Sequence, residues 1–143
     1  MPHALLVFLH ISFLCLAALG ILIADHSAFA WMRGKTETIG KTALLMAHWM
    51  VTIALLGLVY TGLLLFWPER DYLLTQPLFL VKLGFVAALL INSMAIEWLM
   101  HVAAVRPFNS LSSGQKMPLF LSGAVSTLSW IGAGLMGLFL FVF

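Results

Sequence analysis

Four long apolar stretches, separated by short polar segments, dominate the pattern of this chain. They predict helices at roughly 4–26, 41–67, 77–102 and 118–143. Each stretch reaches the roughly 20 residues that a helix needs to cross about 30 Å of hydrocarbon. Backbone groups in lipid must bond within their own segment, so stretches of this length are helices and not open strands. We therefore expect an all-α fold, an integral membrane four-helix bundle that forms a single transmembrane domain over residues 1–143.

The polar segments between these stretches carry most of the charge and set the expected topology. Five basic residues fall in or beside the first and third connections, whereas two lie toward the opposite side. The first group is Arg33, Lys35, Lys41, Arg106 and Lys116, and the second is Arg70 and Lys82. Basic residues accumulate on the cytoplasmic side of a membrane. The pattern thus predicts cytoplasmic first and third connections and both termini outside.

Composition supports a lipid environment and excludes several classes of protein. Of 143 residues, 63% are hydrophobic and only 8% are charged, whereas soluble domains have about a quarter of their residues charged. The net charge of +2 gives no reason to expect nucleic-acid binding. Cys15 stands alone, so there is no disulfide framework. We expect a multi-pass protein of the bacterial inner membrane with a retained first helix, surrounded by the lipid bilayer and without an internal repeat.

Ionisable residues at membrane depth are costly, so they are candidates for function. The set comprises His10, Asp25, His26, His48, Lys82, Glu97 and His101, with Asn92 as a neutral companion. His48 lies seven residues inside Lys41, and His101 lies five residues before Arg106. With alternating helix directions, we expect both imidazoles at a similar depth on the cytoplasmic side, with Asp25, His26 and Glu97 near the same level.

Two kinds of site would use such a layout. A b-type haem needs neutral imidazoles as axial ligands and basic residues for its propionates. His48 with His101 or His10 could supply the ligands, and Asp25 and Glu97 could exchange protons. The alternative is a divalent transition metal held by imidazole and carboxylate together. Its expected ligands are His26, His48, His101 and Glu97, and its function would be metal-ion handling or transport.

A second polar level is expected on the outer side, where His10 and Lys82 lie on the first and third helices. Lys82 could extend to the lipid headgroups, as lysines near helix ends commonly do. Alternatively, the two residues line an anionic or proton-active site in which Lys82 would be catalytic. The other expected catalytic residues, Glu97 and Asp25, lie at the cytoplasmic level. The sequence leaves both interpretations open.

Small residues recur every three or four positions along the last helix, at Ser122, Ser126, Ser129, Ala133 and Gly137. They share one face and would let another helix approach closely. This face predicts packing within the chain, within a homo-oligomer or against another subunit. A non-enzymatic packing subunit of a membrane complex is therefore a third candidate function.

The order of several features resembles that of small bacterial membrane proteins around the HemJ-type protoporphyrinogen oxidases and the CopD-like membrane domains. A histidine opens the first span in Leu9-His10-Ile11, Thr61-Gly62 lies near the end of the second, and Lys82 opens the third. In the HemJ-type family a first-helix histidine and a third-helix lysine are functionally important, and haem b is associated with these proteins. The resemblance implies those roles for His10 and Lys82.

These observations together favour a b-type haem-binding redox protein. The resemblance implies that it could be a HemJ-like oxidoreductase acting on a porphyrin or a quinone. The chain departs from that family in its Ser- and Gly-rich last helix and in His48. The residues do not decide between an enzyme and a subunit without catalytic activity.

Overall fold

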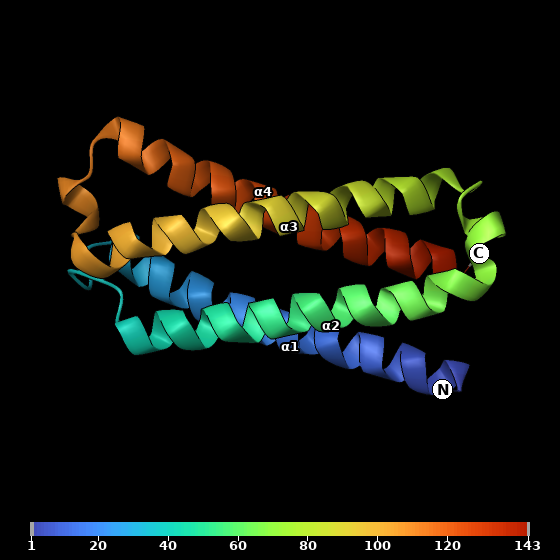
Figure 1. Ribbon diagram of the computed structural model, residues 1–143. Helices are drawn as coiled ribbons and strands as arrows, with labels where there is room; N and C mark the ends of the chain where they lie inside the picture. Colours follow the sequence, from blue (N-terminus) through green and yellow to red (C-terminus); the bar gives the residue numbers. More distant parts are fainter. Residues whose placement is uncertain (1, 143) are drawn as a thin grey trace. The chain divides into compact units, whose positions relative to one another are not determined.

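The computed structural model describes residues 2–142, with side-chain surroundings up to residue 140. Its long helices are α1 (His3–Met32), α2 (Lys41–Leu73), α3 (Pro77–Val105) and α4 (Ser113–Val142), with a short 3-10 turn, η1 (Phe108–Ser110), before α4 (Figure 1). Within the described residues, four helices are long and apolar enough to cross a membrane. The prediction of an all-α chain with four such helices is confirmed.

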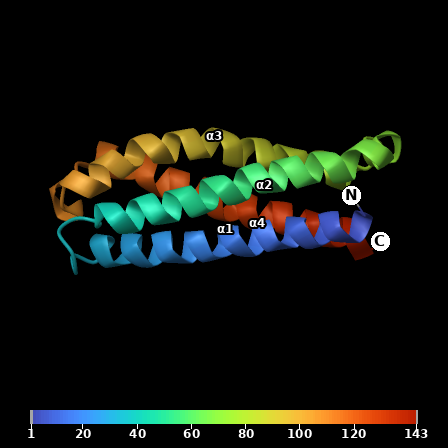
Figure 2. The same ribbon diagram turned by 60° about the horizontal axis from the view of Figure 1, so that its bottom comes forward.

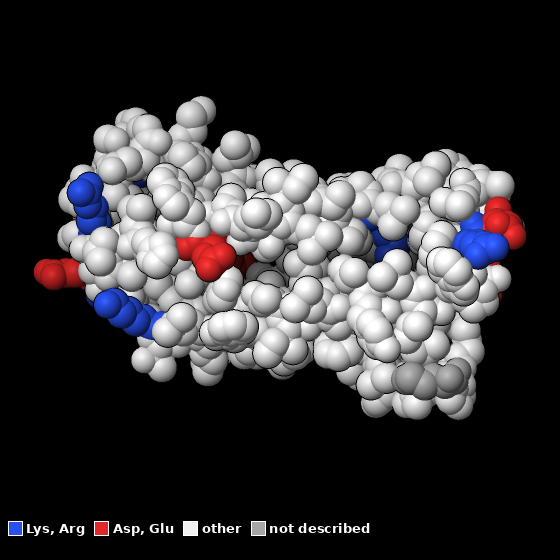
Figure 3. Space-filling model, in the orientation of Figure 1, with Lys and Arg blue, Asp and Glu red and all other residues white. Residues whose placement is uncertain are grey.

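The charged side chains follow the helix ends. On the face shown in Figure 3, most Lys, Arg, Asp and Glu atoms lie toward the ends of the helices, and the surface between them is almost entirely uncharged. Large apolar side chains such as Ile91, Trp98 and Leu128 are exposed on the middle parts of the helices. This distribution agrees with the long apolar stretches of the sequence.

The chain packs as two compact units. One comprises residues up to Glu69 together with Met100–Ser110, and the other comprises Arg70–Leu99 together with the residues from Leu111 onward. In the first unit, α1 and α2 run antiparallel and side by side in both ribbon views (Figures 1 and 2). We call α1 with α2 up to Glu69 the first hairpin. We call α3 up to Leu99 with α4 the second hairpin.

The first hairpin is held together by small residues that let its two helices approach closely. Ala17 and Gly20 of α1 are buried, as are Ala47 and Ala54 of α2. A methyl group at Gly20 would come within 2.8 Å of the Val51 side chain. Helices without large side chains between them gain dispersion contacts along their backbones. The core of this hairpin is therefore narrow and has little room for added volume.

The second hairpin places the predicted small-residue face of α4 against α3. Ser122 and Ser129 are buried, and a methyl group at Gly132 would meet the Phe85 ring. On α3, Leu89 and Asn92 are buried on the same face as Phe85, because residues three and four apart lie above one another on a helix. The packing face predicted for the last helix is thus used within the chain.

The helices extend beyond the predicted ranges, which were roughly 4–26, 41–67, 77–102 and 118–143. The α4 helix begins at Ser113, five residues earlier than expected, and Pro118 lies inside it. The backbone N–H of Ser112 donates to Gln115 Oε1 at 3.1 Å, which is one half of a capping box. Hydrophobicity marks where an apolar segment ends, whereas a cap fixes where the helix begins.

Candidate functional site

The best-defined polar contact within the apolar stretches joins the two helices of the first hairpin. His10 of α1 lies 2.7 Å from Thr61 Oγ1 of α2, measured from its Nδ1 atom. Thr61 is 2% exposed, and its hydroxyl donates to the carbonyl oxygen of Gly57 at 2.7 Å. His10 itself is half-buried. The sequence singled out His10, and Thr61 entered only as part of the family resemblance.

The hydrogen bond that Thr61 donates to Gly57 favours one tautomer of His10. A threonine hydroxyl has a single proton, and Thr61 gives that proton to Gly57. Its oxygen must then accept from His10, so Nδ1 carries the hydrogen and Nε2 is the basic nitrogen of the neutral ring. Histidines that bind metals are commonly oriented in this way, with one ring N–H donated to a fixed acceptor.

Glycines leave space beside this histidine and bring α1 close to α2. A methyl group at Gly62 would lie 3.5 Å from the His10 Cε1 atom, an ordinary van der Waals distance. One turn further along α1, the Phe13 ring lies against Gly57, where a methyl group would come within 2.6 Å of three of its atoms. Phe13 therefore locks the register of the hairpin at the level of the His10–Thr61 contact.

In the second hairpin, Lys82 of α3 runs along α4 at Gly137. Its Nζ atom lies 3.3 Å from the position that a Gly137 Cβ would occupy, and the residue is half-buried. Among the residues that the structure describes, no hydrogen bond or ion pair is recorded for Lys82. An ammonium group has three donors and no acceptor capacity, so this side chain can donate hydrogen bonds to an anionic group.

The predicted cytoplasmic cluster of imidazoles and carboxylates does not form. Among the described residues, no three His, Cys, Asp or Glu side chains gather closely enough to hold a metal ion. Asp25, His26, Glu97 and His101 are all exposed. His48 is half-buried and meets the edge of the neighbouring Trp49 ring, with ring centroids 5.9 Å apart. The sequence fixes the depth of these residues but not the direction in which each side chain points.

Asn92, expected only as a companion, is the most completely bonded polar residue of the second hairpin. It is 7% exposed, and its Nδ2 atom donates to the Ser122 carbonyl oxygen at 3.0 Å. The Ser122 hydroxyl donates in return to Asn92 Oδ1 at 2.9 Å. A hollow of about 490 Å³ lies beside this pair, lined mainly by apolar side chains that include Ile91 and Trp98. The reciprocal bonds indicate a structural role for Asn92.

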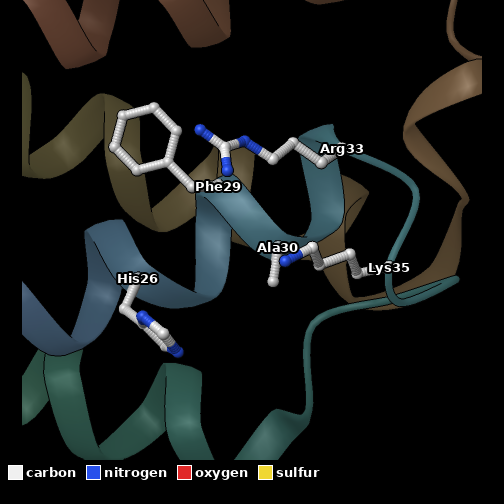
Figure 4. Close-up of a pocket in the computed structure, with 5 residues that line it drawn as sticks. All are labelled: His26, Phe29, Ala30, Arg33 and Lys35. Atoms are coloured by element: carbon white, nitrogen blue, oxygen red, sulfur yellow. The ribbon is translucent and has the colours of Figure 1, made fainter.

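The end of α1 forms a second hollow, of about 160 Å³, lined by His26, Phe29, Ala30, Arg33 and Lys35 (Figure 4). Its shape follows from the way the helix terminates. Gly34 has a φ of +69°, its N–H donates to the Trp31 carbonyl, and the Lys35 N–H donates to the Ala30 carbonyl. This pair of bonds is a Schellman motif, which needs a left-handed residue at the position of Gly34. The turn brings Lys35 back toward the last turn of α1.

An aromatic contact closes the same end of the first unit. Trp31 is 3% exposed, and its indole N–H donates to the Arg106 carbonyl oxygen at 2.9 Å. Its ring meets Phe108 edge-on, with centroids 5.2 Å apart. A backbone bond of 3.1 Å from Ile39 N–H to the Ala103 carbonyl adds to this contact. The sequence did not predict these contacts, because the partners are distant along the chain.

Comparison of the chain with protein-family models, curated proteins and solved structures finds no match. The geometry of the residues therefore carries the functional argument.

Proposed function

We propose that the four helices cross a membrane, with both termini on the outer side and residues 33–40 and 106–112 in the cytoplasm. The length and apolar character of the helices support insertion. The division of basic residues between the two sides supports the orientation. Single cysteines at Thr36, Ser112 or His3, in a Cys15→Ala background, test it. Only the cysteine at His3 should react with an impermeant maleimide added to intact cells, and labelling at Thr36 would overturn the orientation.

Within this bundle, we propose a b-type haem-binding redox protein in which His10 is the axial ligand. The observation that carries the proposal is the chain of bonds from His10 through Thr61 to Gly57. It gives the imidazole a defined orientation, in which Nε2 is the nitrogen that would bind the iron. A haem held by His10 would supply one-electron transfer.

His48 and His101 are weaker ligand candidates than His10. His101 is exposed, and the recorded ring contact of His48 is with its own neighbour in the sequence, Trp49. Neither has the hydrogen-bonded orientation that supports His10. A divalent metal site at the cytoplasmic level is not proposed, because the described residues do not form the required group.

Absorption spectra of the detergent-purified protein, with haemin added during reconstitution, test the haem proposal. The wild-type protein and the His48→Ala and His101→Ala variants should show a Soret band, and His10→Ala should lose it. Circular dichroism of each variant checks the fold. Thr61→Val keeps the side-chain volume but removes the acceptor for Nδ1–H, and we expect roughly 10- to 100-fold weaker haem binding. A colourless wild-type protein that takes up no haemin would overturn the proposal and favour the packing subunit.

Lys82 is proposed as the cation that receives an anionic group of the substrate, such as a porphyrin carboxylate. Its position along Gly137 and the lack of a recorded acidic partner among the described residues support this role. With a quinone added as the acceptor of the six electrons and six protons, Lys82→Met should abolish the oxidation of protoporphyrinogen to fluorescent protoporphyrin in membranes that contain the protein. Lys82→Arg should keep part of this activity. Equal activity of Lys82→Met and the wild type would contradict the role.

A further inference from the structure

The hollow at the end of α1 gathers basic groups that have no recorded acidic partner. Three of its five lining residues, His26, Arg33 and Lys35, are basic, and none is acidic. Among the described residues the recorded ion pair is Arg70 with Asp71, which involves neither Arg33 nor Lys35. Figure 4 shows both long side chains extending back along α1, the guanidinium toward Phe29 and the ammonium toward Ala30. The hollow is therefore a site of concentrated positive charge.

The backbone that carries these groups is held by two hydrogen bonds. The two Schellman bonds, from Gly34 to Trp31 and from Lys35 to Ala30, are 3.0 and 2.9 Å long. They fix the direction in which the chain leaves the helix. A guanidinium presents its donors in a planar fork that matches two phosphate oxygens, and an ammonium adds a point charge. Phe29 and Ala30 provide an apolar wall beside them.

We propose that this hollow binds the phosphate group of an anionic lipid headgroup. The inference depends on the proposed membrane insertion, because insertion places the end of α1 at the level of the headgroups, but it does not depend on haem binding. Basic side chains at the cytoplasmic surface attract anionic lipids. Here the fixed turn converts that general attraction into a single site.

Thermal unfolding of the full chain in detergent tests the site, with phosphatidylglycerol, phosphatidylcholine or inorganic phosphate added. We expect stabilisation by phosphatidylglycerol and little by phosphatidylcholine. The Arg33→Gln/Lys35→Gln variant should bind phosphatidylglycerol roughly 25-fold more weakly, at about fivefold per basic residue. The control Lys41→Gln/Arg106→Gln removes the same charge from positions outside the hollow and should lose clearly less affinity for phosphatidylglycerol.

Equal losses in both double variants would overturn the site and leave a diffuse attraction between charged surfaces. Equal stabilisation by inorganic phosphate and by phosphatidylglycerol would keep the phosphate chemistry but overturn the lipid as its source. Loss of haem binding in His10→Ala has no bearing on either outcome, so the two proposals fail separately.

A second inference follows from a correspondence between the two hairpins. Residues 6–13 read Leu-Val-Phe-Leu-His-Ile-Ser-Phe, and residues 78–85 read Leu-Phe-Leu-Val-Lys-Leu-Gly-Phe. The stretches 41–66 and 116–141 both begin with Lys, and they share two Gly residues and the ending Gly-Leu-x-Leu-Phe. In this alignment of the two sequences, His10 corresponds to Lys82, Gly57 to Gly132, and Gly62 to Gly137.

The contacts within each hairpin repeat in the same positions. Phe13 lies against Gly57 as Phe85 lies against Gly132. Likewise, Gly62 lies beside His10 as Gly137 lies beside Lys82. Buried residues also match in pairs, which are Ala17 with Leu89, Gly20 with Asn92, Ala47 with Ser122, and Ala54 with Ser129. Sequence and packing thus agree on one alignment of the two hairpins.

We infer that the chain contains two copies of one helical hairpin, and that positions 61 and 136 determine how each copy uses its polar residue. Thr61 Oγ1 lies 2.7 Å from His10 Nδ1, whereas the matching residue is Met136, whose thioether is a weak acceptor. The first copy therefore holds an oriented base and the second presents a lysine. This replaces the expectation that the chain has no internal repeat.

Transplanting the first site into the second hairpin tests the inference. In full-length protein labelled with ¹⁵N-histidine, His10 should show a hydrogen-bonded Nδ1–H that Thr61→Val removes. The Lys82→His/Met136→Thr variant should gain a second signal of this kind, and Lys82→His alone should not. A signal in both variants or in neither would overturn the role of position 136. Failure of the double variant to fold would contradict the equivalence of the two positions.

Discussion

The two hairpins differ in the interactions that hold their helices together in the middle. In the first hairpin, Gly20 lies so close to α2 that a methyl group would come within 2.8 Å of Val51. In the second, Asn92 and Ser122 join the helices through two hydrogen bonds of 3.0 and 2.9 Å. Lipid tails are as apolar as leucine, so burial of apolar surface gives helices little reason to associate in a membrane. Close backbone packing and interhelical hydrogen bonds are the two remaining sources of affinity, and the middle of each hairpin uses a different one.

The largest difference between the hairpins should appear at Gly57 and Gly132, each of which packs against a phenylalanine ring. Gly57→Ala should lower the free energy of unfolding by about 2 kcal/mol and Gly132→Ala by about 1 kcal/mol, as is typical of overpacked sites. A methyl group at Gly57 would approach Phe13 as far back as Cγ, which can move little, whereas at Gly132 it would meet the outer edge of Phe85. Unfolding in detergent with increasing dodecyl sulfate measures both. A larger loss at Gly132 would reverse the comparison.

The hydrogen-bonded pair of the second hairpin should contribute a smaller amount. We expect Asn92→Ala to cost about 1 kcal/mol, the usual size for a polar contact between membrane helices. A double-mutant cycle with Ser122→Ala should give a coupling of similar size, because the two side chains bond directly. Ser93→Ala is the control, since its hydroxyl bonds within α3 to Leu90. Zero coupling would show that close packing alone holds this hairpin.

The aromatic contact at the end of the first unit should contribute slightly less to stability than the hydrogen-bonded pair of the second hairpin. Trp31→Phe removes the 2.9 Å bond to the Arg106 carbonyl while keeping a ring near Phe108. The expected cost is slightly below 1 kcal/mol, within the range of about 0.5–1.5 kcal/mol for one neutral hydrogen bond. Trp49→Phe, at a 58% exposed position, should change the unfolding free energy less. The same detergent titration compares them, and equal effects would argue against the bond.

The smallest expected effect has the opposite sign. Gly84→Ala and Gly123→Ala add a methyl group where no atom lies within 4 Å. Alanine favours a helix over glycine by roughly 0.5–1 kcal/mol, so each variant should be slightly more stable than the wild type. Thermal melts resolve a gain of this size when the variants are combined. A loss of stability would reveal a close contact at that face.

The sequence predicted the number and nature of the helices but not the faces on which they pack. Apolar stretches and basic connections locate His48 and Glu97 in depth. However, helices that are apolar all round give little sign of which face is buried. Asn92 was expected only as a companion but lies on the buried face of α3, whereas Glu97 is exposed. For the same reason, the sequence did not reveal that the described His, Asp and Glu side chains form no group of three that could hold a metal ion.

The contact between His10 and Thr61 is difficult to predict from the sequence. Thr61 is 51 positions away, and nothing in its immediate surroundings marks it as an acceptor for a histidine. Only the alignment of the two hairpins, with Phe13 on Gly57 and Phe85 on Gly132, gives the register that brings such residues together. Helix ends such as Ser112 and Gly34 were missed as boundaries because caps act beyond the apolar stretch.

The closure of the first unit by a later part of the chain has a consequence for biosynthesis. Trp31 and Ile39 bond to the carbonyl groups of Arg106 and Ala103, which the ribosome adds only after most of α3 has been made. Domains generally assemble from the N-terminus as they are synthesised, at about 5–20 residues per second. The acceptor of the Trp31 indole N–H is therefore synthesised several seconds after Trp31 itself. During that interval the end of α1 is held by its own glycine turn. A chain released before Arg106 would lack this closure permanently, so truncated products should be recognisable to quality-control proteases by an unprotected Trp31.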